Sequence, residues 1–241
     1  MRVQCGIVAV LGLILPLAAH AQEAVKVSGR VVDAAGKPLP GVEVATFWYA
    51  DKDKMKHYQK GTITDAKGRF ALPITFYAPA RGLFAIAKDR KTGALVVLEE
   101  KRAAKPLEIK LAPLVHVHGR FYCKELKKRP TRTIVLINSG QARFLQCISE
   151  EASFSFLLPA GDYKFWAYGV DIQDLKKALT LKTDKPDLDM GVIDMPATII
   201  ARHKVKAPPA WHVTDARGVK KDVKIADFKG KWVLLEFWGY W

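Results

Sequence analysis

The stretch that decides the fold lies near the N-terminus, where residues 27–44 read VSGRVVDAAGKPLPGVEV. At both ends of this stretch apolar residues recur at every second position, which is the period of a half-buried β-strand. Between them, residues 33–41 supply Asp, Pro and Gly. These residues favour tight turns, because Asp accepts hydrogen bonds from its own turn, Pro presets φ and Gly accepts a positive φ. The stretch therefore predicts two strands joined by turns, the first from Val25 and the second running from Val42 to Trp48.

The same pattern continues beyond this stretch. A second turn at residues 64–68 leads into a strand that contains Phe70 and Leu72. Short strands at this spacing, with almost no helical period, predict a β-sandwich. Further strands are predicted at residues 83–87, 95–98 and 107–111.

Residues 25–112 resemble the carboxypeptidase regulatory-like module, a transthyretin-like β-sandwich. The resemblance is carried by residues 27–44 and by the turn and strand at Thr64-Asp65-Ala66-Lys67-Gly68-Arg69-Phe70. It implies a non-catalytic module that serves as a spacer, a folding aid or a binding surface. Nothing in the chain resembles a carboxypeptidase zinc site.

Residues 114–198 predict a second β-sandwich module, a diverged repeat of the first. Alternation resumes at Val115 to Phe121, and a hairpin is expected between residues 154–158 and 163–167. Residues 171–181 fit two interpretations, because Ile172, Leu175 and Leu179 could line one face of a helix or the segment could form a strand.

Residues 205–241 resemble the start of a thioredoxin-like thiol-disulfide oxidoreductase of the bacterial envelope. The nearly continuous apolar run from Trp232 to Trp238 is typical of a central strand buried on both faces. The dipeptide Gly230-Lys231 precedes it, and Phe237-Trp238-Gly239-Tyr240-Trp241 is similar to the segment that leads into the Cys-x-x-Cys of that family. The expected fold class is therefore mainly β, with two tandem Ig-like or transthyretin-like sandwiches followed by the first elements of an α/β thioredoxin-like fold.

The redox resemblance implies roles for two residues near the C-terminus. Glu236 occupies the position of the buried acid below the dithiol, and Trp241 directly precedes the expected nucleophilic cysteine. The alternative for Glu236 is a carboxylate that faces solvent at a strand edge, since a buried carboxylate without partners is costly. Neither cysteine of the dithiol is present, so we expect the chain to be a fragment with no dithiol exchange of its own.

The N-terminus predicts export. Residues 1–21 combine a positive start at Arg2, an apolar run too short for a stable membrane span, and a small-x-small cleavage pattern at Ala19-His20-Ala21. The mature chain is expected to begin near Gln22 in the periplasm or outside the cell. Cys5 lies before the apolar run and is expected to be removed with the signal peptide.

The chain is strongly basic, with 39 Lys and Arg against 24 Asp and Glu and a formal net charge of +15. Export and the scattered positions of these charges argue against nucleic acid as a partner. We expect weak attraction to anionic envelope surfaces, and protein thiols or disulfides as partners of a full-length redox protein.

Cys123 and Cys147 are the cysteines expected in the mature chain. In an oxidising compartment they are a candidate structural disulfide, which would contribute about 3 kcal/mol on the loop-entropy model. Two buried free thiols are the alternative, and their wide spacing argues against a redox-active pair.

His116 and His118 are two positions apart on a predicted strand, so their rings share one face and could bind a metal ion. No third ligand is identifiable from the sequence, and we expect both rings to face solvent. Asp184, Asp187 and Asp189 lack the spacing of a calcium loop and indicate a polar turn. No metal or cofactor is therefore expected.

Two functions follow from these observations. The first is a fragment of an exported thiol-disulfide oxidoreductase carried behind β-sandwich modules. The alternative is a non-enzymatic secreted β-sandwich protein with a binding or structural role.

Overall fold

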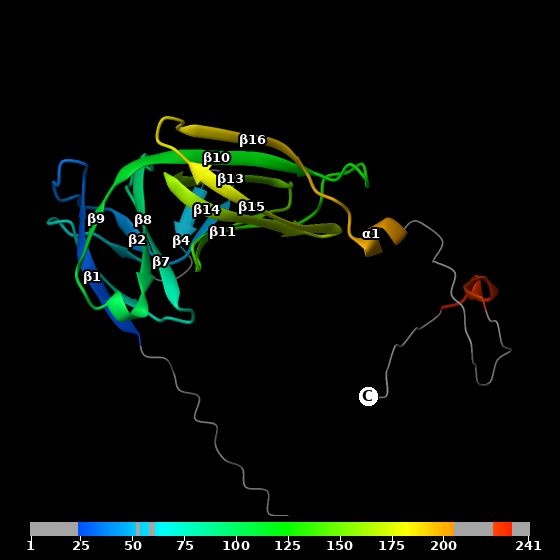
Figure 1. Cartoon of the computed structure of the whole chain (residues 1–241), viewed down its shortest axis with the longest axis horizontal. Coiled ribbons are helices and arrows are strands. Elements are labelled where there is room, and N and C mark those ends of the chain that lie inside the picture. The colour runs from blue at the N-terminus through cyan, green and yellow to red at the C-terminus, as the bar shows by residue number, and fades with distance from the viewer. Residues whose placement is uncertain (1–23, 52–53, 58–60, 205–223, 233–241) are drawn as a thin grey trace, which may run out of the picture.

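A computed structural model describes residues 24–51, 54–57, 61–204 and 224–232. Figure 1 shows a molecule built from packed strands, with helix confined in the described part to α1 (Ile199–His203) and the 3-10 turns η1 (Glu100–Arg102) and η2 (Ile225–Phe228). The prediction of a mainly β protein is confirmed. In the described part of the chain, no helix is long and apolar enough to cross a membrane.

The strands follow one another along the chain with short connections. The first nine are β1 (Val25–Val32), β2 (Glu43–Ala45), β3 (Trp48–Asp51), β4 (Lys54–His57), β5 (Thr62–Ile63), β6 (Arg69–Ile74), β7 (Ala80–Ile86), β8 (Thr92–Glu99) and β9 (Leu107–Lys110). The others are β10 (Ala112–Tyr122), β11 (Thr133–Ser139), β12 (Ala142–Ser149), β13 (Ser153–Pro159), β14 (Gly161–Gly169), β15 (Ile172–Leu181) and β16 (Asp187–Asp194).

Three sheets are formed by the described strands. Sheet A has the order β6-β1-β9, sheet B the order β13-β10-β8-β7-β2-β5, and sheet C the order β15-β14-β11-β12-β3-β4. Strand β16 adds to sheet B by pairing in parallel with β10. Sheet A is small, and the larger sheets B and C both contain strands from the two predicted modules.

Strands β7 and β2 of sheet B separate two hydrophobic cores. Leu83 and Ala85 of β7 belong to one core, whereas the alternate residues Phe84 and Ile86 belong to the other. The core with Leu83 and Ala85 also contains β1 and β6 residues of sheet A, and we call it the A/B core. The core with Phe84 and Ile86 also contains β11, β12 and β14 residues of sheet C, and we call it the B/C core. Because successive residues of a strand point to opposite faces, sheet B is the middle layer at this point.

The stretch from Val42 to Trp48 does not form the single strand that its alternation predicts. The strand is interrupted at Thr46 and Phe47, and the segments before and after them, β2 and β3, belong to different sheets. Strand β2 pairs with β7, whereas β3 pairs in parallel with β12, where Trp48 lies opposite Leu145. This crossing buries the Trp48 side chain completely in the B/C core.

Residues Ile172–Leu181 form strand β15, which decides between the two interpretations of segment 171–181. Strand β15 pairs with β14 along nearly its whole length. Its residues Ile172, Leu179 and Leu181 are buried in the B/C core.

The segment 205–241 is described only at residues 224–232. These residues form η2 and a turn, and no thioredoxin-like sheet is present among them. Trp232, expected at the start of a buried strand, is fully exposed, since no described strand covers it. Glu236 and Trp241 lie outside the described residues, as does the predicted signal peptide, residues 1–21.

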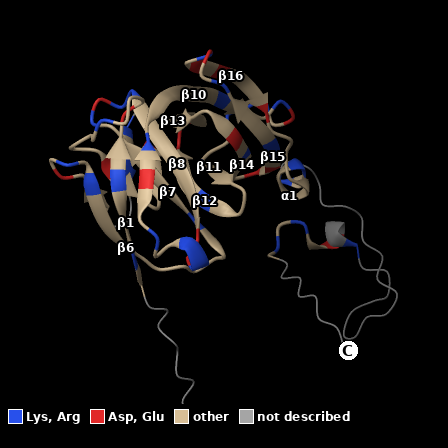
Figure 2. Ribbon diagram, turned by 60° about the vertical axis from the view of Figure 1, so that its left-hand side comes forward, with Lys and Arg blue, Asp and Glu red and all other residues tan. Residues whose placement is uncertain are grey.

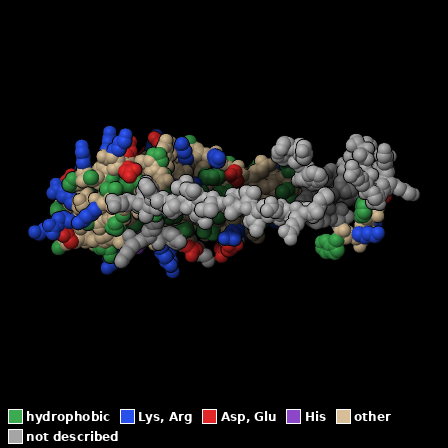
Figure 3. Space-filling view, turned by 90° about the horizontal axis from the view of Figure 1, so that it is seen from below, with side chains coloured by type: hydrophobic (Ala, Val, Ile, Leu, Met, Phe, Trp, Pro, Cys, Tyr) green, Lys and Arg blue, Asp and Glu red, His purple; other side chains and the backbone are tan. Residues whose placement is uncertain are grey.

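The basic residues are spread over the whole described surface, as expected from their scattered positions. Figure 2 shows Lys and Arg on most strands, interspersed with Asp and Glu. In Figure 3 basic side chains project from the end of the molecule where Figure 1 places β1 and β9. Some of these charges are paired, as in the contacts of Arg30 with Glu108 and of Arg69 with Asp65.

Candidate functional site

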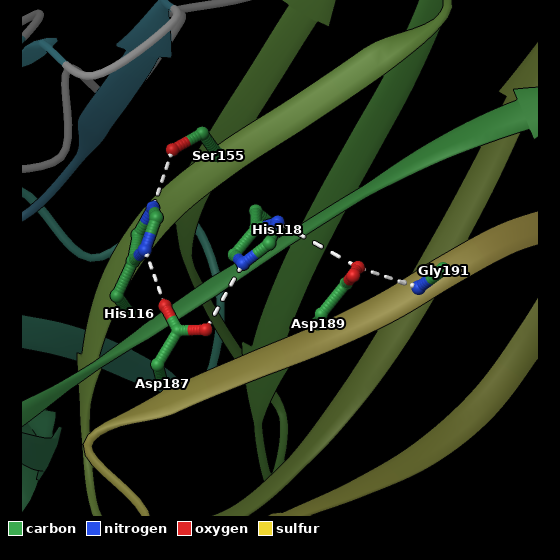
Figure 4. Close-up of polar contacts among 6 residues, drawn as sticks. All are labelled: His116, His118, Ser155, Asp187, Asp189 and Gly191. Atoms are coloured by element: carbon green, nitrogen blue, oxygen red, sulfur yellow. Dashed lines mark hydrogen bonds and ion pairs between the residues drawn. The ribbon is translucent and has the colours of Figure 1, made fainter.

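Two histidines and two aspartates form a cluster on the outer face of sheet B. Strand β10 contributes His116 and His118, and its parallel neighbour β16 contributes Asp187 and Asp189. In the pairing of these strands His116 lies opposite Asp187, and His118 lies opposite Asp189. We call these four residues the His-Asp cluster (Figure 4).

The cluster is exposed because the alternate residues of β10 are buried. Val115 and Val117 enter the B/C core, so His116 and His118 must lie on the opposite face of the sheet. Their side chains are 38% and 33% exposed. The predicted orientation of both histidines is therefore confirmed, although neither side chain is fully solvated.

Asp187 contacts both imidazole rings. Its Oδ1 lies 2.8 Å from Nδ1 of His116, and its Oδ2 lies 3.1 Å from Nε2 of His118. The rings stack with their centroids 4.8 Å apart and an angle of 25° between their planes. Hydrogen bonds from His118 and then from His116 hold the pKa of the Asp187 carboxyl below its usual range.

The second nitrogen of each ring also has a polar neighbour. Nε2 of His116 lies 2.8 Å from the Ser155 hydroxyl on β13, and Nδ1 of His118 lies 3.6 Å from Oδ1 of Asp189. The Asp189 carboxylate accepts a hydrogen bond of 2.7 Å from the backbone N–H of Gly191. The His116 ring thus has hydrogen-bond partners on two sides, whereas the His118 ring has one hydrogen-bond partner and one more distant carboxylate, as Figure 4 shows.

An open hollow of about 880 Å³ borders the cluster. Its walls come from β3, β10, β12, β13 and β16, at the place where the turn between β12 and β13 connects sheet C to sheet B. Residues His118 and Asp189 line both the hollow and the cluster.

Among the described residues, the lining of the hollow is acidic although the whole chain is basic. The charged side chains of these lining residues include one arginine, Arg120, against four carboxylates. Tyr49, Ile148 and Val192 add apolar surface, and the Val192 residue is 68% exposed. The four carboxylates are Asp51, Glu150, Glu151 and Asp189.

Cys123 and Cys147 are free in the structure and buried in the B/C core. Burial raises the pKa of the Cys147 thiol to about 11, with a backbone hydrogen bond at Ser155 as the opposing influence. A thiol with so high a pKa is a poor nucleophile at neutral pH, because the thiolate is the reactive form.

The structure brings together residues that the sequence analysis kept apart. The prediction that Asp187 and Asp189 belong to a polar turn is wrong, because both lie on β16. The turn ends before them, and pairing with β10 extends the backbone. The alternation of Asp187, Leu188 and Asp189 was a signal for a strand, but its partner strand could not be read from it.

No protein-family model matches the chain. No curated protein sequence matches it. Among solved structures, the chain is similar to the Bacillus anthracis TIE protein, with 12% identity over 73% of this chain and 34% of that chain and a TM-score of 0.33. A streptococcal ancillary pilin has 12% identity over 74% of this chain and 64% of that chain, with a TM-score of 0.32. GBS52, a minor pilin of Streptococcus agalactiae, has 10% identity over 71% of this chain and 96% of that chain, with a TM-score of 0.32. The chain thus spans about a third of the first of these proteins and just under two thirds of the second.

Proposed function

We propose that this chain is an exported, non-enzymatic β-sandwich protein that binds a cationic ligand in the hollow beside the His-Asp cluster. The observation that carries the proposal is the acidic lining of the hollow in a chain whose formal net charge is +15. The ligand class is a basic peptide segment, because a Lys or Arg side chain offers both a charged head and an apolar stem.

The electrostatic part of this recognition comes from the carboxylates around the hollow. Asp51 ends β3, while Glu150 and Glu151 form the β12–β13 turn, so acidic groups approach the hollow from two elements. Opposite charges at about 4 Å attract by several kcal/mol at the effective dielectric near a protein surface before desolvation is counted. Acidic groups on two walls therefore favour a cation between them over an anion.

The apolar part comes from Tyr49, Ile148 and Val192. These side chains can contact the methylene groups of a bound Lys while the ammonium group stays near the carboxylates. A ligand with charge alone would leave this surface in contact with water. The combination favours peptides over inorganic cations in the hollow itself.

A titration with a short Lys-rich peptide tests the proposal. Isothermal titration calorimetry is expected to show binding that weakens as salt rises, because these charges are partly exposed and screened. The double variant Asp51→Asn/Glu150→Gln is expected to bind the peptide several-fold more weakly. Glu99→Gln, a variant of an exposed carboxylate on β8 outside the hollow, is the matched control and is expected to bind normally. Equal binding of a Glu-rich peptide, or no effect of the double variant, would contradict the proposal.

A second candidate function is thiol-disulfide exchange in a longer protein. It is supported by the resemblance of residues 230–241 to the segment before a redox Cys-x-x-Cys. The test is the reading frame beyond Trp241, which is expected to continue directly into Cys-x-x-Cys. A frame without paired cysteines there removes this candidate and leaves the binding function unaffected. Insulin reduction by the 241-residue chain itself would contradict the expectation that exchange depends on a Cys-x-x-Cys directly after Trp241.

A further inference from the structure

We propose that His116, His118 and Asp187 bind one divalent transition-metal ion of the zinc class. Ligand atoms of these three residues lie within 4.8 Å of one another. Imidazole nitrogen and carboxylate oxygen are ligands that suit Zn²⁺ and its neighbours in the first transition row. This site is distinct from the peptide hollow, although the two share His118.

The two rings already point the required atoms at a common place. Nδ1 of His116 and Nε2 of His118 both face the Asp187 carboxylate, at 2.8 Å and 3.1 Å. In a tetrahedral zinc site, neighbouring ligand atoms lie roughly 3.3 to 3.5 Å apart, because each is about 2.0 to 2.1 Å from the metal. The three ligand atoms lie within 4.8 Å of one another, so rotation of the partly exposed His116, His118 and Asp187 side chains is needed to reach this spacing.

The second nitrogen of the His116 ring has the hydrogen-bond partner that is usual for a metal-bound histidine, and that of His118 has a carboxylate 3.6 Å away. A ligating imidazole usually holds its second nitrogen in a hydrogen bond, which fixes the ring and its tautomer. Here Ser155 Oγ lies at Nε2 of His116, and Asp189 Oδ1 lies near Nδ1 of His118. Each ring therefore has one nitrogen free to bind the metal once Asp187 turns toward the ion.

The strand pairing makes the arrangement rigid. The parallel pairing of β10 and β16 fixes the backbone of all three ligands, and the pairing of β10 with β13 fixes Ser155. Asp189 is held by the backbone N–H of Gly191, whose φ of +65° is the left-handed conformation that favours glycine. Three protein ligands leave a fourth position open, and the exposure of the cluster gives solvent access to it.

The exported protein, prepared without a histidine tag, is titrated with ZnCl₂ by isothermal titration calorimetry, with MgCl₂ as the comparison cation. We expect one Zn²⁺ per chain in this site and no comparable Mg²⁺ binding, since Mg²⁺ prefers oxygen ligands. Zn²⁺ affinity is expected to fall at least tenfold in His118→Ala and in Asp187→Asn. Ser155→Ala is expected to lower it about tenfold through loss of the outer contact. His203→Ala, a variant of an exposed histidine on α1, is the matched control and is expected to bind Zn²⁺ normally.

A second measurement on the unaltered protein locates the ion. Long-range ¹H–¹⁵N spectra of the imidazole groups are expected to show Zn²⁺-induced shifts at Nδ1 of His116 and Nε2 of His118. Circular dichroism in the presence of EDTA checks that each variant is folded. Absence of stoichiometric Zn²⁺ binding, or shifts confined to other histidines, would overturn the proposal. Loss of peptide binding with Zn²⁺ binding intact would overturn only the proposed peptide function.

Discussion

At the scale of single residues, Thr64 shows how one buried side chain holds two turns together. Its Oγ1 donates a hydrogen bond of 2.7 Å to the carbonyl oxygen of Leu39 and accepts one of 2.9 Å from the N–H of Val42. The residue is only 4% exposed, so water cannot replace these partners. The Thr64 side chain thus joins the turn before β2 to the turn before β6.

We predict that Thr64→Val destabilises the protein by about 1–3 kcal/mol, because it removes the partner of the buried Val42 N–H and of the partly buried Leu39 carbonyl while it preserves the side-chain shape. Chemical denaturation followed by circular dichroism measures this change. Thr64→Ser keeps the hydroxyl and is the control, with a smaller loss expected from the missing methyl group. Equal stabilities of the Val variant and the original protein would show that the hydroxyl has no net role.

The local strands could be predicted from residue patterns because alternation is a property of neighbouring positions. Val27 and Val31 are buried on one face of β1, as their spacing predicts. The orientation of His116 and His118 followed from the same two-residue period. Their approach to Asp187 could not be predicted, because it depends on the pairing of strands about 70 positions apart, which no local pattern encodes.

At the scale of elements, helix α1 is attached to the sandwich by charged contacts. Arg202 binds both carboxylate oxygens of Glu125, and Lys204 pairs with Asp171. The Arg202 guanidinium lowers the pKa of Glu125, and Lys204 followed by Lys128 lowers the pKa of Asp171. Most of the apolar surface of α1 stays exposed, with Ile199 at 69% and Ile200 at 73%, so these contacts add to the attachment that the buried Ala201 provides.

We predict that α1 detaches as the pH falls below about 4. Carboxyl groups whose folded-state pKa is lowered stabilise the folded state above their unfolded pKa of about 4, and this stabilisation is lost as pH falls through the lower folded value. The protection factors of the Arg202 and Lys204 amides, which are their hydrogen-exchange rates relative to the intrinsic rate at each pH, report the detachment between pH 6 and pH 3. The double variant Glu125→Gln/Asp171→Asn is expected to have lower protection factors at pH 6 and to lose their pH dependence. An attachment that is equally strong at pH 3 and pH 6 would contradict this assignment.

Sequence alternation correctly placed most strands but not the sheet that each one joins. The alternation continues through Val42, Val44, Thr46 and Trp48 as it would in one strand. The chain nevertheless turns at Thr46, so that β3 belongs to sheet C and β2 to sheet B. This turn places Trp48 against Phe84, in a core to which the C-terminal half also contributes residues such as Phe144. The contacts that decide it are tertiary, and tertiary packing overrides local strand preference.

At the scale of the whole molecule, the two predicted modules share their packing. The B/C core contains Trp48 and Phe84 from the N-terminal half together with Phe144, Phe156 and Phe165 from the C-terminal half. The rings of Trp48 and Phe84 lie 5.8 Å apart, and those of Phe84 and Phe144 lie 5.6 Å apart, in edge-on contacts. The modules at residues 25–112 and 114–198 stay a prediction, but their unfolding should be coupled through these contacts.

We predict that residues 24–204 unfold in one cooperative transition and that residues 112–204 alone do not fold. The shorter fragment lacks the β3–β4 hairpin that pairs with β12, and it lacks the Trp48 and Phe84 rings that fill the B/C core. Removal of large buried aromatic side chains costs about 3–5 kcal/mol each, which is a large part of the stability of an ordinary domain. Near-ultraviolet circular dichroism and the dispersion of ¹H–¹⁵N spectra distinguish the two outcomes.

A point variant separates the effect of the shared core from the effect of shortening the chain. Trp48→Ala in residues 24–204 is expected to lower the free energy of unfolding by about 3–5 kcal/mol, because it removes a buried ring from the core that the two halves share. Tyr77→Ala is the matched aromatic control, since Tyr77 is 72% exposed, and it is expected to change stability little. A well-dispersed spectrum and a cooperative transition for residues 112–204 alone would instead mean that the C-terminal half completes its own core, with the β3–β4 hairpin as an addition to its edge.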